Sequence, residues 1–242
     1  MNVISSGRPK RPSKLLDALR SRAQGGGSGH LGFGATHTEV KRRLILVASL
    51  SAFDKGALRA IAGAGADGIE VTIRGTQDLA ALGALLPDMA IPVGIVLDAA
   101  ESGEDLGSII EAAGVDWIRL SLQSSALALA WEKTARFVTI PEDLELRRVP
   151  ALNVLEVDAV VIEGSGLRKG GLRIEDALRL ATLGELCKKP LFLDMGPGIA
   201  GEFFSVAQQC GMNGVFHTVE PETAADDVAD YVKALEAQAS TT

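Results

Sequence analysis

Charged and polar side chains alternate with apolar ones along two short segments of the chain. The polar positions are Glu70, Thr72 and Arg74 in the first segment, and Arg119, Ser121 and Gln123 in the second. Because successive side chains of a strand point to opposite faces, each set is expected on one face of a strand. A carboxylate there can act as a general base, and a guanidinium can hold an anion or stabilise an enolate. We therefore predict catalytic roles for Glu70 and Arg119, with Arg74, Ser121 and Gln123 binding substrate.

Three further carboxylates, Asp98, Glu163 and Asp194, follow apolar runs where strands are expected to end. Glu163 and Asp194 join the candidate catalytic residues, because a carboxylate at a strand end can take up or release a proton. All three are also candidate ligands of a divalent cation, which prefers oxygen donors. Solvated or helix-capping carboxylates are the alternative.

Two glycine-rich segments follow two of these runs, one after Glu163 and one after Asp194. Their candidate substrate-binding residues are Gly164, Ser165, Gly166 and Lys169 in the first segment, and Gly196 and Gly198 in the second. Free backbone N–H groups and a following helix dipole favour a bound anion such as phosphate or carboxylate. Ordinary turn formation explains such glycines equally well.

A recurring pattern indicates which elements position these residues. Residues 64–71, 113–120 and 210–217 each combine a Gly, then Asp or Asn, then an apolar run, and residues 155–162 repeat the pattern without the Gly. Each copy is typical of a helix ended by a left-handed residue and followed by a strand. The copies lie roughly 42 to 55 residues apart, which is about two β-α units. Four copies therefore predict eight strands.

The expected strands alternate with amphipathic helices along the whole body of the chain. They are residues 44–50, 68–73, 91–97, 117–122, 136–140, 159–162, 191–195 and 214–219. This order predicts parallel pairing and a closed (β/α)8 barrel, with an open doubly wound sheet as the alternative. By this pattern alone, the chain resembles the TIM-barrel superfamily over about residues 40–237. The resemblance implies a site at the carboxyl ends of the strands.

The repeats also set the register of the strands. Glu70 and Arg119 are expected in one interior layer, where they can pair, and His217 is expected on the helix-facing side. A structural ion pair is the alternative to a catalytic one. A charged group inside a barrel costs several kcal/mol unless it is paired.

Residues 1–39 differ from the barrel segment at 40–242. The first sixteen residues contain no Asp or Glu and carry four cations, Arg8, Lys10, Arg11 and Lys14. We expect a flexible basic N-terminal arm with a short helix over residues 13–23, followed by a glycine-rich linker. Alternatives to a mobile tail are a homo-oligomerisation arm, an arm for an anionic partner, and an organellar transit peptide.

Composition excludes several classes of protein. A net charge of −7 argues against nucleic-acid binding by the barrel. The two cysteines, Cys187 and Cys210, suggest no disulfide framework, so a reducing cytoplasmic setting is expected. The apolar stretch at residues 79–97 is interrupted by Pro87 and Pro92, which argues against a membrane span.

These observations predict a metabolic enzyme acting on a small anionic substrate, phosphorylated or carboxylated. Proton abstraction next to a carbonyl, as in isomerases and lyases, suits the candidate residues. A divalent metal ion is the more favoured cofactor and FMN the less favoured one. The alternatives are a flavin-binding oxidoreductase and a non-catalytic scaffold whose arm binds partners.

Overall fold

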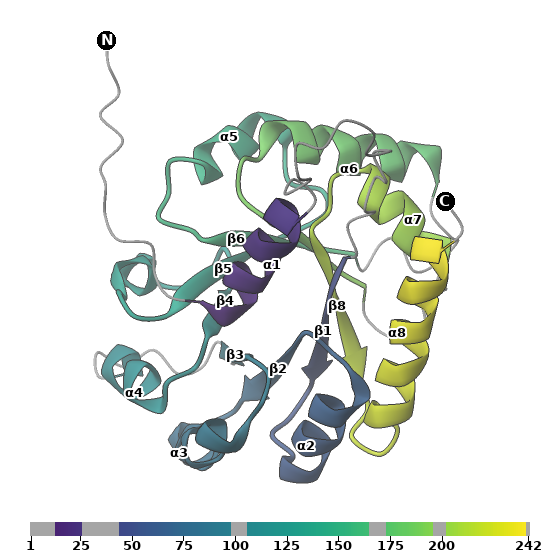
Figure 1. Ribbon diagram of the computed structural model, residues 1–242. Helices are drawn as coiled ribbons and strands as arrows, with labels where there is room; N and C mark the ends of the chain where they lie inside the picture. The colour runs from purple at the N-terminus through teal and green to yellow at the C-terminus, as the bar shows by residue number, and fades with distance from the viewer. Residues whose placement is uncertain (1–12, 26–43, 98–105, 165–172, 196–201, 241–242) are drawn as a thin grey trace, which may run out of the picture.

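The chain forms a closed parallel β-barrel surrounded by helices (Figure 1). The computed structural model describes residues 13–25, 44–97, 106–164, 173–195 and 202–240. The strands are β1 Ile45–Leu50, β2 Gly68–Ile73, β3 Val93–Leu97, β4 Trp117–Leu120, β5 Ala135–Ile140, β6 Ala159–Glu163, β7 Leu191–Asp194 and β8 Gly214–Val219. They pair in chain order, and β8 pairs with β1. The predicted (β/α)8 barrel is therefore confirmed, and the open sheet is wrong.

The helices cover the outside of the barrel. They are α2 Lys55–Ala64, α3 Thr76–Leu85, α4 Leu106–Ala113, α5 Val149–Leu152, α6 Ile174–Leu186, α7 Glu202–Gln209 and α8 Ala224–Ser240, with short 3-10 helices η1 Leu86–Asp88, η2 Ala126–Ala130 and η3 Leu146–Arg148. The stretch at residues 79–97 is divided among α3, η1 and β3. Among the described residues, no helix is long and apolar enough to cross a membrane.

The repeated segments have the local structure that their sequence predicts. Gly65, Gly114 and Gly211 have φ angles of 96°, 76° and 83°, the left-handed region that glycine tolerates. After each glycine, an Asp or Asn directly precedes an even-numbered strand, namely Asp67 before β2, Asp116 before β4 and Asn213 before β8. In the copy without the glycine, Asp158 precedes β6 in the same way. Three of these side chains accept the backbone N–H of a residue in the preceding strand or at its start: Asp67 from Leu46 at 2.9 Å, Asp158 from Arg136 at 2.9 Å and Asn213 from Leu191 at 2.8 Å. These bonds tie neighbouring strands together at their amino ends.

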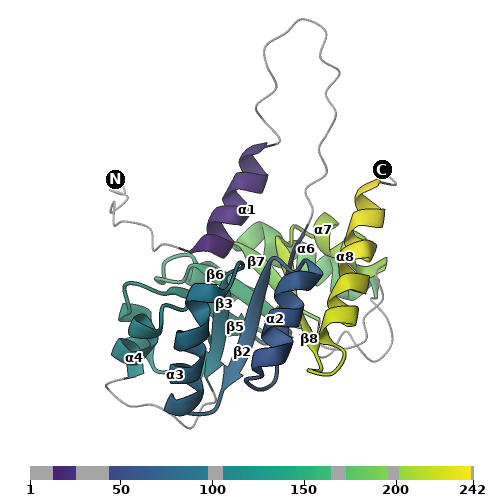
Figure 2. The ribbon, with the colours of Figure 1, turned by 60° about the horizontal axis from the view of Figure 1, so that its bottom comes forward.

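The described part of the N-terminal arm forms a helix. Helix α1 spans Lys14–Gly25, and the Ser13 hydroxyl caps it by accepting the N–H of Leu16 at 3.2 Å. The helix lies over the amino ends of the strands (Figures 1 and 2). Leu15 and Leu16 are buried in one cluster with residues of the barrel interior. Residues 13–22 therefore pack against the barrel, because two apolar side chains leave water there.

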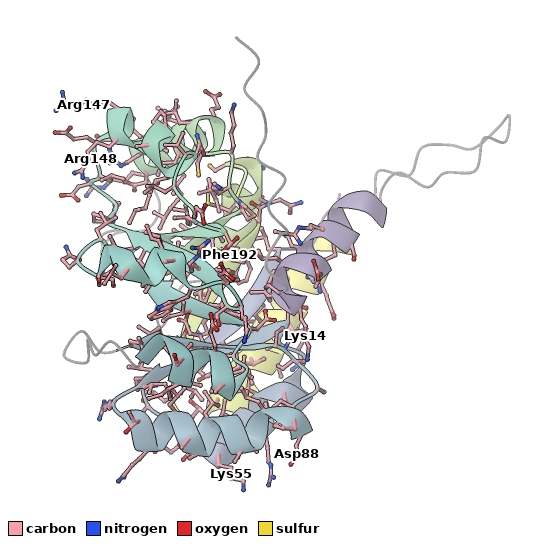
Figure 3. The ribbon with its side chains drawn as sticks, turned by 90° about the vertical axis from the view of Figure 1, so that its left-hand side faces the viewer. Lys14, Lys55, Asp88, Arg147, Arg148 and Phe192 are labelled. Atoms are coloured by element: carbon pink, nitrogen blue, oxygen red, sulfur yellow. The ribbon has the colours of Figure 1, made fainter. Side chains whose placement is uncertain are left out.

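The strands divide their side chains between two cores. Ile69, Val71 and Ile73 of β2, and Ile118 and Leu120 of β4, pack towards the helices. The interior cluster includes Trp117, Phe137, Phe192 and Phe216, whose neighbouring rings lie 5.4 to 6.4 Å apart. Figure 3 shows Phe192 in the middle of the barrel, with Arg147 and Arg148 at the periphery. The register places Glu70 and Arg119 inside, as predicted.

Candidate active site inside the barrel

Glu70 of β2 and Arg119 of β4 form an ion pair in the barrel interior. Arg119 Nη2 lies 3.0 Å from Glu70 Oε1, and the Glu70 side chain is only 1% exposed. Ser49 Oγ donates to Oε1 at 3.1 Å, and Trp117 Nε1 donates to Oε2 at 3.2 Å. The predicted pairing of Glu70 with Arg119 is therefore confirmed, and each carboxylate oxygen has a hydrogen-bond donor.

Arg119 connects Glu70 to a second carboxylate. Its Nη1 donates to Asp194 Oδ2 at 2.7 Å, and the side chains of Arg119 and Asp194 are 15% and 17% exposed. The guanidinium carbon also lies 5.2 Å from the centre of the Phe216 ring, within range of a cation–π contact. The three groups, which we call the Glu70–Arg119–Asp194 cluster, run from a buried carboxyl to one with access to water.

Burial and charge act in opposite directions on this cluster. Burial raises the pKa of the Glu70 carboxyl above its ordinary value, although Arg119 opposes the shift. For Arg119, burial lowers the pKa, but the carboxylates of Glu70 and Asp194 outweigh it, so that the pKa stays raised. The guanidinium therefore remains charged, while Glu70 holds a proton more tightly than an ordinary glutamate does. Such a group is typical of acid–base sites, although structural ion pairs show the same behaviour.

Glu163 lies beside this cluster at the carboxyl end of β6. It is the register partner of Asp194 in β7, is exposed, and acts electrostatically on Arg119. Half-buried threonines occupy interior positions of three strands at the same end, namely Thr72, Thr139 and Thr218. The open end of the barrel therefore combines two carboxylates, one guanidinium and several hydroxyls.

The remaining predicted residues that the structure describes lie in three settings. Ser121 and Gln123 are exposed in the turn after β4, because that strand ends at Leu120 rather than at residue 122. Ser121 Oγ accepts the Gln123 N–H at 3.2 Å, so its hydroxyl stabilises the turn. Arg74 is exposed and lines a hollow of about 400 Å³ with residues 75–78 at the start of α3. Gly164 is buried and donates its N–H to the Asp194 carbonyl at 3.0 Å. The other candidates, Asp98, Ser165, Gly166, Lys169, Gly196 and Gly198, lie outside the described residues.

The metal prediction has limited support at this end of the barrel. Of its three ligands, Glu163 and Asp194 are neighbours, but Asp98 lies outside the described residues. Asp194 already accepts a charged hydrogen bond from Arg119, which competes with a cation. Among the described residues, no group of three or more His, Cys, Asp or Glu could hold a metal ion. The described side chains alone therefore do not supply a metal centre.

A second hollow, of about 460 Å³, opens beside Glu163. Its walls include Glu142 and Asp143 after β5, and Glu175 and Arg179 of α6. Arg179 donates to the carbonyl oxygens of Glu142 and Leu144 and so holds the loop after β5 against α6. Carboxylates outnumber cations in these walls, so the hollow is acidic.

His217 lies on the outer side of β8, as the register predicts. It is buried, and its ring lies 3.8 Å from the ring of Tyr231 in α8. The imidazole therefore faces the helix layer, away from the Glu70–Arg119–Asp194 cluster.

Sequence reasoning missed three features of this site. It did not foresee that Asp194 bonds Arg119, or that Trp117 and Ser49 hold the two oxygens of Glu70. A signal existed for the last two, since Ser49 and Trp117 stand at inward positions of their strands. The partner of Asp194 depends on how the barrel closes and staggers, which the alternating pattern does not encode.

The closed parallel barrel and its polar carboxyl end define a (β/α)8 fold of the TIM-barrel type. No protein-family model and no curated protein sequence matches the chain. Solved structures with a similar fold include tryptophan synthase from M. tuberculosis in its aminoacrylate-bound form. It has a TM-score of 0.68 and 13% identity, over 93% of this chain and 100% of that chain.

Two Pyrococcus furiosus structures are also similar. A mutant tryptophan synthase α-subunit has a TM-score of 0.64 and 14% identity, over 79% of this chain and 97% of that one. A chain of the tryptophan synthase complex gives 0.63 and 13%, with the same coverage. At such low identity, the likeness shows a shared fold and nothing finer.

Proposed function

We propose that this barrel is an enzyme that transfers a proton next to a carbonyl of a small anionic substrate, as isomerases and lyases do. The Glu70–Arg119–Asp194 cluster carries this proposal. It joins a buried carboxyl with a raised pKa to a carboxylate near solvent through one guanidinium. The cluster lies towards the carboxyl ends of the strands, where barrel enzymes have their sites.

Exposure decides the role that each group takes in this proposal. Asp194 is 17% exposed, so its carboxylate is the base that reaches a substrate carbon acid, and exposed Glu163 beside it is a second proton carrier. Arg119 donates to the oxygen on which negative charge develops. Glu70 is a candidate base by residue type, but it is 1% exposed and pairs with Arg119, so we assign it the positioning of that guanidinium.

The anionic group of the substrate is assigned to the rim of the barrel. At the open end, the carboxylates of Glu163 and Asp194 stand beside Arg119 and would repel a phosphate, whereas a single developing oxyanion can still accept from the guanidinium. Arg74 borders a hollow at the start of α3, and the N-cap residue of that helix, Gly75, has no side chain that could occupy the N–H groups of the first turn. The free N–H groups of a first helical turn favour an anion. The other predicted anion-binding residues, Ser165, Gly166, Lys169, Gly196 and Gly198, lie outside the described residues and stay predictions.

Proton exchange tests the proposal before the substrate is identified. The purified protein is incubated in D2O with a panel of small phosphorylated and carboxylated carbonyl compounds, and deuterium incorporation is followed by NMR. Exchange of at least one compound is expected, with a loss of about 100-fold or more in Asp194→Asn. Asp230→Asn is the matched control, because Asp230 forms an exposed pair with Lys233 on α8. Absence of exchange with the whole panel would reject the proposal.

The same preparation separates the two alternatives. A yellow protein with a flavin absorption spectrum would favour the oxidoreductase, whose phosphate would bind at the loops after β6 and β7. A colourless protein without exchange activity would favour the scaffold, with the cluster as a structural ion pair. In that case, self-association of the full chain is the property to measure next by native mass spectrometry.

A further inference from the structure

Helix α1 contacts the amino ends of the two strands that carry Glu70 and Arg119. Asp116, which directly precedes β4, accepts Lys14 N–H at 2.7 Å, the Ser13 hydroxyl at 2.8 Å and Leu15 N–H at 3.1 Å. Asp67, which directly precedes β2, pairs with both terminal nitrogens of Arg22, at 2.6 and 3.2 Å. One helix therefore connects β2 with β4 through two charged contacts.

Asp116 differs here from the equivalent residues of the repeat. Asp67, Asp158 and Asn213 each accept a backbone N–H from the preceding strand or its start. Every hydrogen bond of the Asp116 carboxylate within the described residues goes instead to residues 13–15. One of four repeated side chains is thus committed to the N-terminus of α1, where a carboxylate is favoured by the unpaired N–H groups and the helix dipole.

The contact continues from α1 into the barrel. The Leu15 side chain is fully buried at the amino ends of the strands, in one cluster with Trp117. Trp117 directly follows Asp116 in the sequence. A Cβ atom at Gly68 would lie 3.1 Å from both the Leu15 side chain and the Trp117 indole, so both side chains pack around that glycine in one buried cluster. The other end of the indole donates to Glu70 Oε2. Packed atoms therefore connect α1 with the buried carboxylate of the cluster.

We propose that α1 is a positioning element of the candidate active site, in which Leu15 and Asp116 hold Trp117 so that its indole N–H fixes Glu70 against Arg119. The inference rests on the proposed function only in treating the cluster as the active site. The helix also keeps water out of the barrel from the amino end. Loss of this cover would hydrate Glu70 and weaken its hold on the guanidinium, without any change in the residues that face substrate.

Trp117 itself reports on the contact. Trp131→Phe leaves Trp117 as the only tryptophan, and its emission is expected to change as Glu70 titrates. Charged or hydrogen-bonding groups that act on Glu70 are Arg119, Asp194, Ser49 and Trp117. The transition is expected above the ordinary glutamate pKa of about 4.3. It is expected to vanish in Glu70→Gln, and its absence from the Trp131→Phe parent would overturn the inference.

Two substitutions weaken the contact without opening a core cavity. Arg22→Ala removes the pair with Asp67, and Asp116→Asn replaces the carboxylate that caps α1. Each is expected to lower the emission midpoint towards the ordinary glutamate pKa, because water reaches Glu70 and burial is the main cause of its raised pKa, and to increase acrylamide quenching of Trp117. Leu15→Ala is expected to act more strongly.

Two matched controls separate this role from general destabilisation. Arg20→Ala removes an exposed pair with Asp17 on the same helix, and Asn213→Ala removes the equivalent repeat contact before β8. Both are expected to leave the midpoint unchanged. An unchanged midpoint in both Arg22→Ala and Asp116→Asn would overturn the inference. The readout needs no substrate, so a shifted midpoint without proton exchange would reject the proposed function while keeping the role of α1.

Discussion

The two halves of the barrel interior are built on the same strands but have opposite character. In β4 and β7, Trp117 and Phe192 belong to the aromatic cluster, while Arg119 and Asp194 stand two residues further along and form an ion pair. One step of about 7 Å along a strand thus separates a packed apolar core from a charged site. The comparison indicates that the aromatic half supplies the cohesion that offsets the desolvation of charges in the other half.

Two buried arginines sharpen the same comparison. Arg119 makes close contacts with Glu70 and Asp194, whereas Arg136, on the outer face of β5, is fully buried with Asp158 and Glu156 at 3.5 and 3.7 Å. Among the described residues, no guanidinium nitrogen of Arg136 has a hydrogen-bond partner. Burial alone therefore does not distinguish the two arginines; the close ion pairs of Arg119 with Glu70 and Asp194 do.

The largest effect is expected from breaking the aromatic half. Trp117→Ala deletes a fully buried indole that stacks on Phe137 at 5.6 Å. We expect the free energy of unfolding to fall by about 3–5 kcal/mol, as for other large-to-small core substitutions. Urea denaturation followed by circular dichroism measures it, with Trp131→Phe as the control. A loss below about 1 kcal/mol would show that the aromatic cluster adds little cohesion.

The charged half is tested by comparing the two arginines. Arg119→Met leaves Glu70 buried without its cation, so a loss of about 3 kcal/mol is expected near neutral pH. The loss is expected to be smaller under acidic conditions, where Glu70 takes up a proton. Arg136→Met is expected to be neutral or stabilising, because its ion pairs are long. Urea denaturation measures the free energy of unfolding of both variants. Equal losses would mean that the close ion pairs of Arg119 stabilise the fold no more than the long ion pairs of Arg136.

The boundary between the halves is tested at Gly94. A Cβ atom at this position would overlap the Trp117 indole. Gly94→Ala is therefore expected to displace the indole from Glu70 and to cost about 1–3 kcal/mol. Gly63→Ala in α2 is the control, because nothing lies within 4 Å of its Cβ position, and it is expected to gain up to about 1 kcal/mol. Thermal unfolding of both variants measures the difference; a harmless Gly94→Ala would mean that the indole has room to move.

The smallest effect is the pH dependence contributed by Glu70. Since its pKa is raised in the folded state, the folded protein binds this proton more tightly than the unfolded chain does. Its contribution to stability is therefore complete below the ordinary glutamate pKa of about 4.3, and is lost as the pH rises through the folded-state pKa. The stability of the wild type minus that of Glu70→Gln should fall across this range in denaturation series. A constant difference would contradict the raised pKa.

Much of this molecule could be predicted because its sequence repeats itself. The left-handed glycines and the alternation around Glu70 and Arg119 were sufficient for the barrel, its register and the central ion pair. Asp116 could not be distinguished from Asp67 and Asp158, because all three are aspartates and only α1 changes the partner of Asp116. Ser121 and Gln123 were expected on a strand that a hydroxyl-stabilised turn ends earlier. The partner of Asp116 depends on a contact between segments that are distant in the sequence, and the end of β4 depends on a side-chain bond within a turn; the alternating pattern encodes neither.

The closing contact of the barrel has a consequence for how the chain folds. Seven of the eight strand pairings join consecutive strands, and only the pairing of β1 with β8 brings together the two ends of the barrel segment. Local pairings form at a small entropic cost, whereas this one waits for the whole ring to be built. The closing step should therefore limit the folding rate. A circular permutant opened between two other strands would shift that slow step to the new ends while retaining the same native ring.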